Sequence, residues 1–415
     1  MNPLKRIAVT VYGRFNEKLI KREFENYTKS LPQRIADIRQ KDVVKVGFLL
    51  HEVSLWKTEE LFISMLQHPR FQPIIYTTIT AEGKLSVNCQ KYNHLLAYLN
   101  DKGYEFEELT SINEIDADLI FYEKPYDVSY FKDFQAKECP ALIAYIAYGI
   151  NNFKSPYAYN LATVRRSIHF YVENELVKNS LCSIMDNNGK NVRVTGTPIM
   201  DVLSKSKDKF ADPWKISPVR KKRIIWAPHH TISGDTQSWL KLSSFLSIHE
   251  GMLSLAEKYA SQVQFAFKPH PLLFNKLIAI WGKEKTIEYY NQWSNLENAQ
   301  LEEGEYIGLF KHSDAMIHDC GSFLIEYLYT GNPVMYMVRD RESTVEQLNE
   351  FGRLGLEQVY EGSEIADIEK FINDIIADID PKKVERKSFY DKYLIPSNGK
   401  TACENIISAI LGIQK

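Results

Sequence analysis

The feature that most constrains the fold of this chain is a regular alternation of short apolar runs with segments of helical spacing. Residues 43–50 read VVKVGFLL, a β-branched run of the kind buried in parallel sheets, and residues 55–67 repeat apolar side chains at helical intervals. Strands that alternate with helices are typical of a parallel sheet covered on both faces. The first half contains further predicted elements: strands at 73–79, 117–123 and 141–149, and a helix at 92–103.

A second series of the same kind follows a predicted linker. Residues 204–222 are polar and proline-containing, which favours an irregular connection. At 415 residues the chain is too long for one core and suits two domains of about 150–200 residues each. We therefore expect an α/β protein with two Rossmann-like, doubly wound domains, at residues 42–203 and 223–390, facing each other across a cleft. The strands predicted around and after the linker are 191–201, 223–228, 262–271, 314–321 and 333–338.

The N-terminal segment differs in charge from the rest of the chain. Residues 1–41 carry ten basic and four acidic side chains, a net charge of +6, and Leu19, Ile20, Phe24 and Tyr27 recur at helical spacing. Two interpretations are open: a solvated amphipathic helix lying on the first domain, or a basic arm resting on an anionic membrane surface. Either one predicts a helical N-terminal extension.

The overall composition excludes several classes of protein. The net charge is −2, so no general positive field favours a nucleic-acid partner. The five cysteines are far apart, which is typical of a reducing compartment. No signal peptide is evident, and the best apolar run, residues 139–150, is well short of the roughly 20 residues that a spanning helix needs. We expect a cytoplasmic protein that contacts the inner face of the plasma membrane at most peripherally.

Histidines follow three predicted strands of the second half. His229 and His230 come after residues 223–228, His270 ends the run FAFKPH, and His318 ends DAMIH. In a doubly wound sheet, ligands bind at the carboxyl ends of the strands, where these side chains would converge. Such a cluster suits two chemistries, a metal site or a phosphate site.

The neighbouring residues decide between these two chemistries. A metal site would take neutral imidazoles with Asp319, whereas a phosphate site would use imidazole N–H groups with Lys268 and backbone N–H groups. Gly321 and Ser322 open a predicted helix at 319–331, and a helix start with small residues attracts anions. Glu326 lies one turn later, within reach of a ribose hydroxyl. We therefore expect a donor phosphate and nucleotide site, with no metal and no other cofactor.

Several blocks of this half resemble, in order and spacing, the CDP-glycerol glycerophosphotransferase family, whose members build teichoic-acid and capsule polymers. The resemblance covers roughly residues 190–410 and implies the two-domain glycosyltransferase-B architecture, in which the C-terminal segment, residues 391–415, packs back across the domain junction. The blocks that carry it are IIWAPHHT (224–231), FAFKPHP (265–271), SDAMIHDCGSFLIEYLYTGNPVMYM (313–337), VTGTPIMDVL (194–203) and DKYLIPSNGKTACENII (391–407).

The resemblance also implies roles for particular residues. His270 and Ser322 would bind the donor phosphate, and Glu326 would bind the nucleotide. The family carries a Trp-His-Gly-Thr segment in its first domain, whose histidine is the proposed base. The nearest counterpart in this chain is AYIAYGIN (144–151), with Tyr148 before Gly149 and no histidine.

The first domain offers other groups that could accept a proton from an acceptor hydroxyl. His51 and Glu52 directly follow the strand predicted at residues 43–50, at the carboxyl edge that faces the cleft. We predict that His51 or Glu52 is the catalytic base and that Tyr148 helps to position the substrate. In the alternative, His51 caps the following helix or binds a loop carbonyl.

Together these features predict a transferase that moves glycerol or ribitol phosphate from a CDP-activated donor to a hydroxyl of a cell-surface glycan or lipid-linked acceptor, releasing CMP. The alternative of the same architecture is a glycosyltransferase that uses a nucleotide sugar in capsule or lipopolysaccharide synthesis. A nucleotide-sugar epimerase-like or purely binding protein, and a metal hydrolase built on the histidines, are the other classes that the sequence leaves open.

Overall fold

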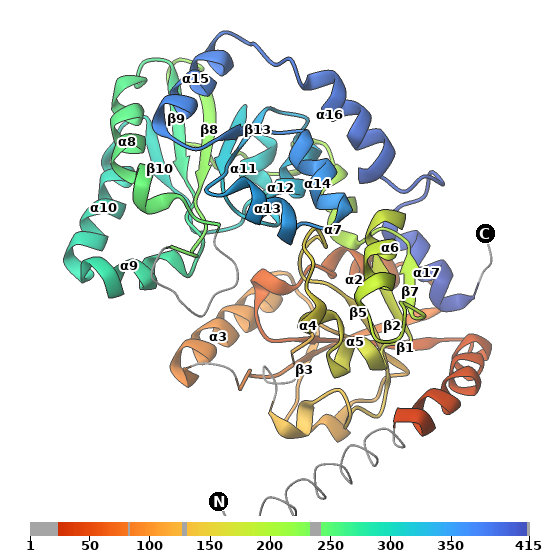
Figure 1. Cartoon of the computed structure of the whole chain (residues 1–415). Helices are drawn as coiled ribbons and strands as arrows, with labels where there is room; N and C mark the ends of the chain where they lie inside the picture. The colour runs from red at the N-terminus through yellow and green to blue at the C-terminus, as the bar shows by residue number, and fades with distance from the viewer. Residues whose placement is uncertain (1–23, 82–83, 127–130, 233–241, 413–415) are drawn as a thin grey trace, which may run out of the picture.

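The computed structural model describes residues 24–81, 84–126, 131–232 and 242–412. They form two α/β lobes, each built around one parallel sheet with helices on both of its faces (Figure 1). The expected pair of Rossmann-like domains is confirmed. Among the described residues, no helix is both long and apolar enough to span a bilayer.

The first sheet has seven strands in the order β3-β2-β1-β4-β5-β6-β7, and all of the pairings are parallel. The strand order reverses between β1 and β4, which creates a switch point where ligands bind in such sheets. The strands are β1 (Val44–Leu50), β2 (Phe71–Thr77), β3 (Phe106–Glu108), β4 (Leu119–Tyr122), β5 (Leu142–Ile146), β6 (His169–Val172) and β7 (Val192–Val194).

The second sheet repeats this plan with six parallel strands in the order β10-β9-β8-β11-β12-β13. Its switch point lies between β8 and β11. Trp226 of β8 stacks on Phe267 at 4.9 Å between ring centroids and forms the centre of an aromatic core. The strands are β8 (Lys222–Ala227), β9 (Val263–Phe267), β10 (Ala299–Leu301), β11 (Ala315–His318), β12 (Val334–Met337) and β13 (Tyr360–Gly362).

The helices connect successive strands and cover the sheets (Figure 1). The first domain contains α2 (Glu59–Leu66), α3 (Leu85–Asp101), α4 (Pro156–Tyr159), α5 (Ala162–Arg166), α6 (Glu175–Ile184) and α7 (Pro198–Ser204). The later helices are α8 (Phe245–Lys258), α9 (Leu273–Trp281), α10 (Lys283–Asn295), α11 (Ile307–Lys311), α12 (Phe323–Glu326), α13 (Arg341–Gln347), α14 (Glu350–Glu357), α15 (Ile365–Ile376), α16 (Lys383–Phe389) and α17 (Ala402–Leu411).

Several predicted elements need correction, among them the helix expected at 92–103, which is α3 and begins at Leu85, and the strand expected at 262–271, which ends at Phe267. The strand expected at 191–201 ends at Val194, because Gly196 adopts a positive φ and Pro198 starts helix α7. The single helix expected at 319–331 is the four-residue α12 followed by a 3₁₀ turn at Tyr327–Thr330.

The N-terminal extension is helical over residues 24–40 and packs on the first domain. Ile38 is buried in the core of that domain, and the Tyr27 hydroxyl donates a hydrogen bond to the Arg166 carbonyl at 2.5 Å. The guanidinium of Arg166 lies over the Tyr27 ring. Residues 1–23, including Leu19 and Ile20, lie outside the described part of the chain.

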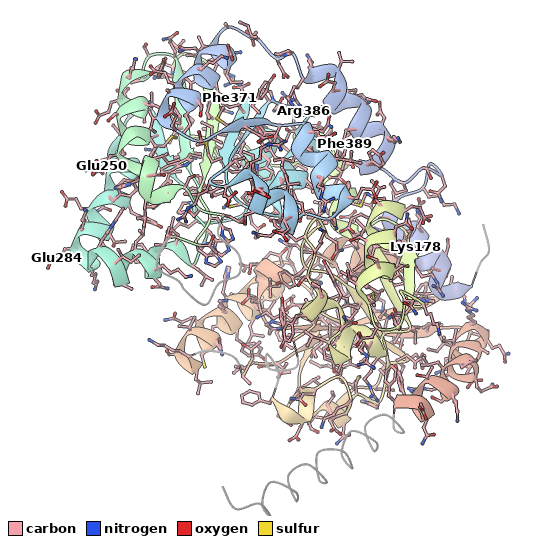
Figure 2. The ribbon with its side chains drawn as sticks, viewed as in Figure 1. Lys178, Glu250, Glu284, Phe371, Arg386 and Phe389 are labelled. Atoms are coloured by element: carbon pink, nitrogen blue, oxygen red, sulfur yellow. The ribbon has the colours of Figure 1, made fainter. Side chains whose placement is uncertain are left out.

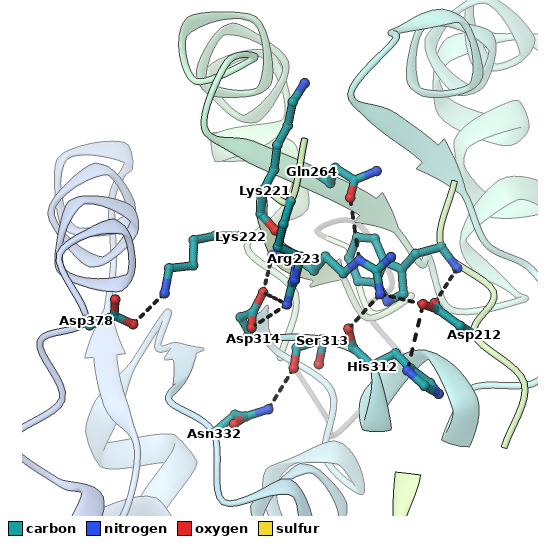
Figure 3. Close-up of polar contacts among 12 residues, drawn as sticks. Asp212, Lys221, Lys222, Arg223, Gln264, His312, Ser313, Asp314, Asn332 and Asp378 are labelled. Atoms are coloured by element: carbon teal, nitrogen blue, oxygen red, sulfur yellow. Dashed lines mark hydrogen bonds and ion pairs between the residues drawn. The ribbon is translucent and has the colours of Figure 1, made fainter. Parts of the chain in front are cut away.

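The predicted linker is fixed to the second domain over most of its length (Figure 3). Arg223 pairs with Asp212 at 2.7 Å, and the side chain of Trp214 is buried. On the other side, Lys205 pairs with Glu60 of α2 in the first domain at 2.6 Å. The crossing between domains therefore takes place in the few residues between Lys205 and Asp212, because ion pairs hold both of its ends.

The chain crosses back near its C-terminus. Arg386 and Phe389 of α16 lie against the second domain (Figure 2), where Arg386 donates a hydrogen bond to the Gly331 carbonyl at 3.1 Å. After Leu394 the chain returns to the first domain, whose core includes residues of α17. The carboxylate of Asp201 accepts hydrogen bonds from the first two backbone N–H groups of α17, both at 2.8 Å. This cap fixes α17 to α7.

The two domains also meet directly at an interdomain clasp, which we define as residues 151–154 of the first domain against Gly321 and residues 346–349 of the second. The Asn152 side chain donates a hydrogen bond to the Gly321 carbonyl at 2.6 Å. In the opposite direction Asn349 donates two hydrogen bonds. Its side chain donates to the Asn151 carbonyl at 2.7 Å, and its backbone N–H donates to the Asn152 carbonyl at 3.0 Å. The loop after β5 is thereby joined to the turn that begins α12.

Candidate functional site

Three of the predicted site histidines gather at the carboxyl edge of the second sheet. His229 and His230 follow β8, and His270 follows the neighbouring strand β9. The ring of His230 lies 4.3 Å from each of the other two rings, and those of His229 and His270 are 5.0 Å apart, measured between centroids. This part of the predicted cluster therefore comes together.

Hydrogen bonds fix the proton on two of these imidazoles. The Nδ1 atom of His229 accepts from the backbone N–H of Thr231 at 3.3 Å, and Nδ1 of His270 accepts in the same way from Leu272 at 3.1 Å. A neutral imidazole has one N–H and one lone pair. Because Nδ1 uses the lone pair, Nε2 carries the proton, and each ring presents an Nε2–H donor.

Burial keeps both rings uncharged. It lowers the pKa of His229 to about 2, with neighbouring His230 and His270 adding to the effect, and it lowers the pKa of His270 to about 3, with His230 again contributing. The potential ligand atoms of the three rings lie within 4.8 Å of one another, which would suit a metal by distance alone. However, a metal needs a free lone pair at Nε2, so these tautomers favour an anion.

Lys268 brings a cation to the same edge. Its ammonium donates a hydrogen bond to the Gly304 carbonyl at 2.6 Å, and burial lowers its pKa. This lysine directly follows β9, two residues before His270, and its side chain is held by the loop beyond β10.

The side chain of Asp319 connects two loops of the second domain through hydrogen bonds. Its carboxylate accepts hydrogen bonds from the backbone N–H of His229 at 2.5 Å and from the N–H and hydroxyl of Ser244 at 2.7 and 3.0 Å. Burial raises its pKa to about 6 in spite of these bonds. The residue joins the loop after β8 to the start of α8, so it orients His229 and does not face a ligand itself.

His318 does not join the cluster. It is the last residue of β11, and its fully buried ring packs against Tyr336 of β12 at 5.1 Å between centroids. His229 and His270 lie two and three residues beyond the ends of their strands, where side chains are free to turn toward the sheet edge. The expected convergence fails for His318 because a residue inside a strand points to a face of the sheet.

The turn that begins α12 contributes the remaining predicted residues. Ser322 occupies the N-cap position and hydrogen bonds with the side chain of Glu326. Burial raises the pKa of Glu326, and the positive charge of Lys57 from the first domain opposes that rise. A side chain at Gly321 would place its Cβ 2.5 Å from the Phe153 ring, so any larger residue would force that ring of the clasp to move. The short α12 also has a weaker dipole than the long helix expected from the sequence.

The first domain has its own cluster of polar side chains, which lies at the switch point of its sheet. His51 follows β1 and Glu123 follows β4, and His51 Nδ1 lies 2.8 Å from Glu123 Oε2. Glu52 instead pairs with Lys91 at 2.5 Å and accepts from the Ser54 hydroxyl at 2.7 Å. Burial raises the pKa of Glu52, but these contacts outweigh burial and lower the pKa overall. Tyr148 lines a narrow pocket together with Glu123 and Lys57.

Glu123 is a site residue beyond those predicted from the sequence, although the sequence contains a signal for it. The residue ends the run ADLIFYE, directly after a predicted strand, at the same type of position that singled out His51 and the histidines of the second half. The prediction takes this whole run as a strand, whereas β4 ends at Tyr122 and leaves Glu123 just beyond it.

Comparisons with known proteins agree with this architecture. A family described as CDP-glycerol:poly(glycerophosphate) glycerophosphotransferase matches residues 148–412. The search of curated proteins found no match. Among solved structures, the chain is similar to the wall teichoic acid polymerase TagF, with 14% identity, a TM-score of 0.58, and coverage of 94% of this chain and 97% of the other.

Two further structures with the same fold carry uridine nucleotides. The S. aureus MnaA–UDP structure matches at 15% identity and a TM-score of 0.55, covering 89% of this chain and 96% of the other. The UDP-GlcNAc 2-epimerase from Neisseria meningitidis bound to UDP-GlcNAc matches at 16% identity and a TM-score of 0.55, covering 89% and 100%. At such identities these similarities establish the shared glycosyltransferase-B type fold.

Proposed function

The chain belongs to the CDP-glycerol:poly(glycerophosphate) glycerophosphotransferase family, and from this membership we propose that it transfers glycerol phosphate, or the related ribitol phosphate, from a CDP-activated donor to a hydroxyl of a glycan or lipid-linked acceptor. It is a transferase, and CMP would be its second product. The donor would bind the second domain and the acceptor the first.

The observation that carries this proposal is the pair of uncharged Nε2–H donors of His229 and His270 at the carboxyl edge of the second sheet. The diphosphate of a nucleotide donor is an anion that accepts several hydrogen bonds at once. Hydrogen bonds to a charged partner contribute about 1.5–3 kcal/mol each. Lys268 and the backbone N–H groups near Ser322 would add to the same site.

The proposed chemistry follows from this binding mode. The acceptor oxygen attacks the β-phosphorus of the donor in line, and the bond from that phosphorus to the bridging oxygen breaks. Negative charge then grows on the departing CMP, where the imidazole N–H groups and Lys268 would stabilise it. Hydrogen-bond donors that are already in place lower the activation barrier, because the protein need not reorganise them during the reaction.

A thermal-shift screen tests the donor assignment. The purified protein is measured with CDP-glycerol, CDP-ribitol, CMP, UDP-glucose and GDP-mannose, each also with His270→Ala and Ser322→Ala. We expect cytidine compounds alone to raise the Tm, and both variants to lose most of that rise. Stabilisation by uridine or guanosine compounds would instead point to glycosyl transfer on the same fold.

We also propose that the N-terminal basic segment holds the protein near an anionic lipid surface. Residues 1–41 have a net charge of +6, and each basic residue close to such a surface contributes about 1 kcal/mol. The packed helix at residues 24–40 would attach this charge to the acceptor domain, which suits an acceptor that is anchored in a membrane.

A further inference from the structure

The switch point of the first sheet carries a buried acid, Glu123, that has no role in the proposed function so far. Glu123 follows β4, and one of its oxygens, Oε2, lies 2.8 Å from His51 Nδ1 and accepts the backbone N–H of His51 at 3.2 Å. Both side chains are almost fully buried, with exposures of 1% for His51 and 3% for Glu123. One carboxylate oxygen is thereby held in place from two directions.

The other oxygen of Glu123 has a different environment. Oε1 is buried, and within the described ranges no hydrogen-bond donor reaches it. A buried polar atom without a partner is uncommon in native proteins and calls for an explanation, such as a catalytic role. Glu123 also lines the narrow pocket that it shares with Tyr148, Lys57 and Thr58. A substrate hydroxyl in an opened form of this pocket would be the missing donor.

The pocket adjoins the donor side of the molecule through Lys57. The ammonium of this lysine lies 5.0 Å from the ring centroid of Tyr306 in the second domain, and its charge acts on Glu326. Glu326 in turn hydrogen bonds with Ser322, the residue expected to contact donor phosphate. Contacts therefore run without interruption from the pocket of the first domain to the turn that begins α12.

The two other candidates for a base are placed less well. The carboxylate of Glu52 is already occupied by Lys91 and Ser54, and Glu52 does not belong to the pocket lining. The imidazole of His51 is also absent from that lining and instead contacts Glu123. This leaves Glu123 as the acid that faces the pocket.

We propose that Glu123 accepts the proton of the acceptor hydroxyl and that His51 is the positioning residue that orients its carboxylate. The inference rests on the proposed function and deepens it. In this step the hydroxyl proton passes to Oε1 of Glu123, while the oxygen lone pair forms the new bond to the β-phosphorus. The electrons of the broken phosphorus–oxygen bond leave with CMP, and the protonated Glu123 later returns its proton to water.

The test measures CMP release from CDP-glycerol with a short glycerol phosphate oligomer that ends in a free hydroxyl. Glu123→Gln keeps the shape of the side chain and removes the base, so we expect kcat to fall by about 10²–10⁴ while the thermal shift with CDP-glycerol stays unchanged. Glu108→Gln is the matched control, because Glu108 ends β3 on the same sheet but lies at its exposed edge. Normal turnover by Glu123→Gln would overturn the inference.

Two further measurements separate chemistry from folding. In Glu123→Ala, added formate should restore part of the CMP release, because a small carboxylate can occupy the space of the missing base; no restoration would count against the role. His51→Asn, which retains a donor near the position of Nδ1, should be more active than His51→Ala and should shift the acid limb of the kcat/KM profile. If the His51 variants lose activity but the pH profile of kcat/KM does not change, His51 has only a structural role.

The proposed function and this inference fail in different ways. If the wild-type protein neither binds CDP-glycerol nor releases CMP, the proposed function is wrong. If wild type is active and Glu123→Gln is equally active, the function stands and the base lies elsewhere.

Discussion

At the scale of single residues, the proposed donor site depends on which ring nitrogen of each histidine carries a proton. The Nδ1 atoms of His229 and His270 each accept a hydrogen bond from the backbone N–H of the residue two positions later in the sequence. A tight local turn therefore sets the tautomer of each ring. The ring then offers a donor without the desolvation cost of a buried cation. A charged imidazole would bind phosphate more strongly, but the same burial that shields the site also keeps the ring neutral.

This arrangement predicts how donor binding depends on pH. His270 has a pKa of about 3 in the free protein, and a bound diphosphate raises it by favouring the protonated ring. Affinity for CDP-glycerol should therefore be flat between pH 6.5 and 8 and should strengthen only as the pH falls toward the raised value. Isothermal titration calorimetry at several pH values measures this. Affinity that declines steadily above pH 6.5 would show that a charged histidine is required.

Substitution of His270 tests whether its ring donates a hydrogen bond to the bound nucleotide. His270→Ala should weaken CDP-glycerol binding by about 10- to 100-fold, the loss expected for one charge-assisted hydrogen bond. His270→Gln should recover part of it, because its amide Nε2 can donate from a similar position. The control is His249→Gln in α8, a histidine whose ring packs against Phe245 and Trp281.

Only part of the site could be predicted from the sequence. Strand ends located His229, His230 and His270, because the carboxyl edge of a parallel sheet gathers whatever follows its strands. For the other residues, the outcome depended on their position relative to the end of the strand. His318 still belongs to its strand and is buried, whereas Glu123 lies one residue past the end of its strand and faces the pocket. Sequence-based strand boundaries are too imprecise to resolve that offset.

At the scale of elements, the clasp shows how backbone proximity joins the two domains. Helix α14 begins at the clasp: the Asn349 side chain accepts the Gly352 N–H at 2.9 Å and donates to the Asn151 carbonyl at 2.7 Å. At Gly352 the helix runs so close to the first domain that an added Cβ would collide with the carbonyl oxygen of Asn152. One side chain therefore both starts a helix and joins two domains.

Gly352→Ala tests this contact. Alanine favours a helix by about 1 kcal/mol over glycine, so an isolated α14 would gain stability. In the intact protein we expect the opposite, a fall of several degrees in Tm and a larger radius of gyration by small-angle scattering, because the new methyl group forces the clasp apart. Gly149→Ala, in the loop after β5 where an added Cβ meets nothing within 4 Å, is the control. An unchanged Tm and radius in Gly352→Ala would contradict the importance of the clasp.

The strands that the sequence did not reveal are short. Strands β3, β10 and β13 have three residues each, too few to show a period, and they extend the sheets through backbone pairing with a neighbour. The longer strands β1 and β8 agree with their predicted ranges to within one residue at each end, because strands covered on both faces have long apolar runs.

At the scale of the whole molecule, the proposed membrane contact can be tested by truncation. Residues 1–23 carry six basic and two acidic side chains, and their removal leaves the packed helix at 24–40 intact. We expect the truncated protein to sediment less with liposomes containing anionic lipid, to bind neutral liposomes no differently, and to keep its Tm. Equal sedimentation of both forms with anionic liposomes would rule out a role for these residues.

The two passages of the chain between the domains have a mechanical consequence. One lies between Lys205 and Asp212, and the other follows Leu394, whose carbonyl accepts the Tyr329 hydroxyl at 2.8 Å. A single tether would let one domain tumble relative to the other, whereas two separated pivots leave one easy degree of freedom, rotation about the line that joins them. If the clasp opens during turnover, such a rotation would return His270 and Glu123 along the same arc, so their alignment need not be found anew in each turnover.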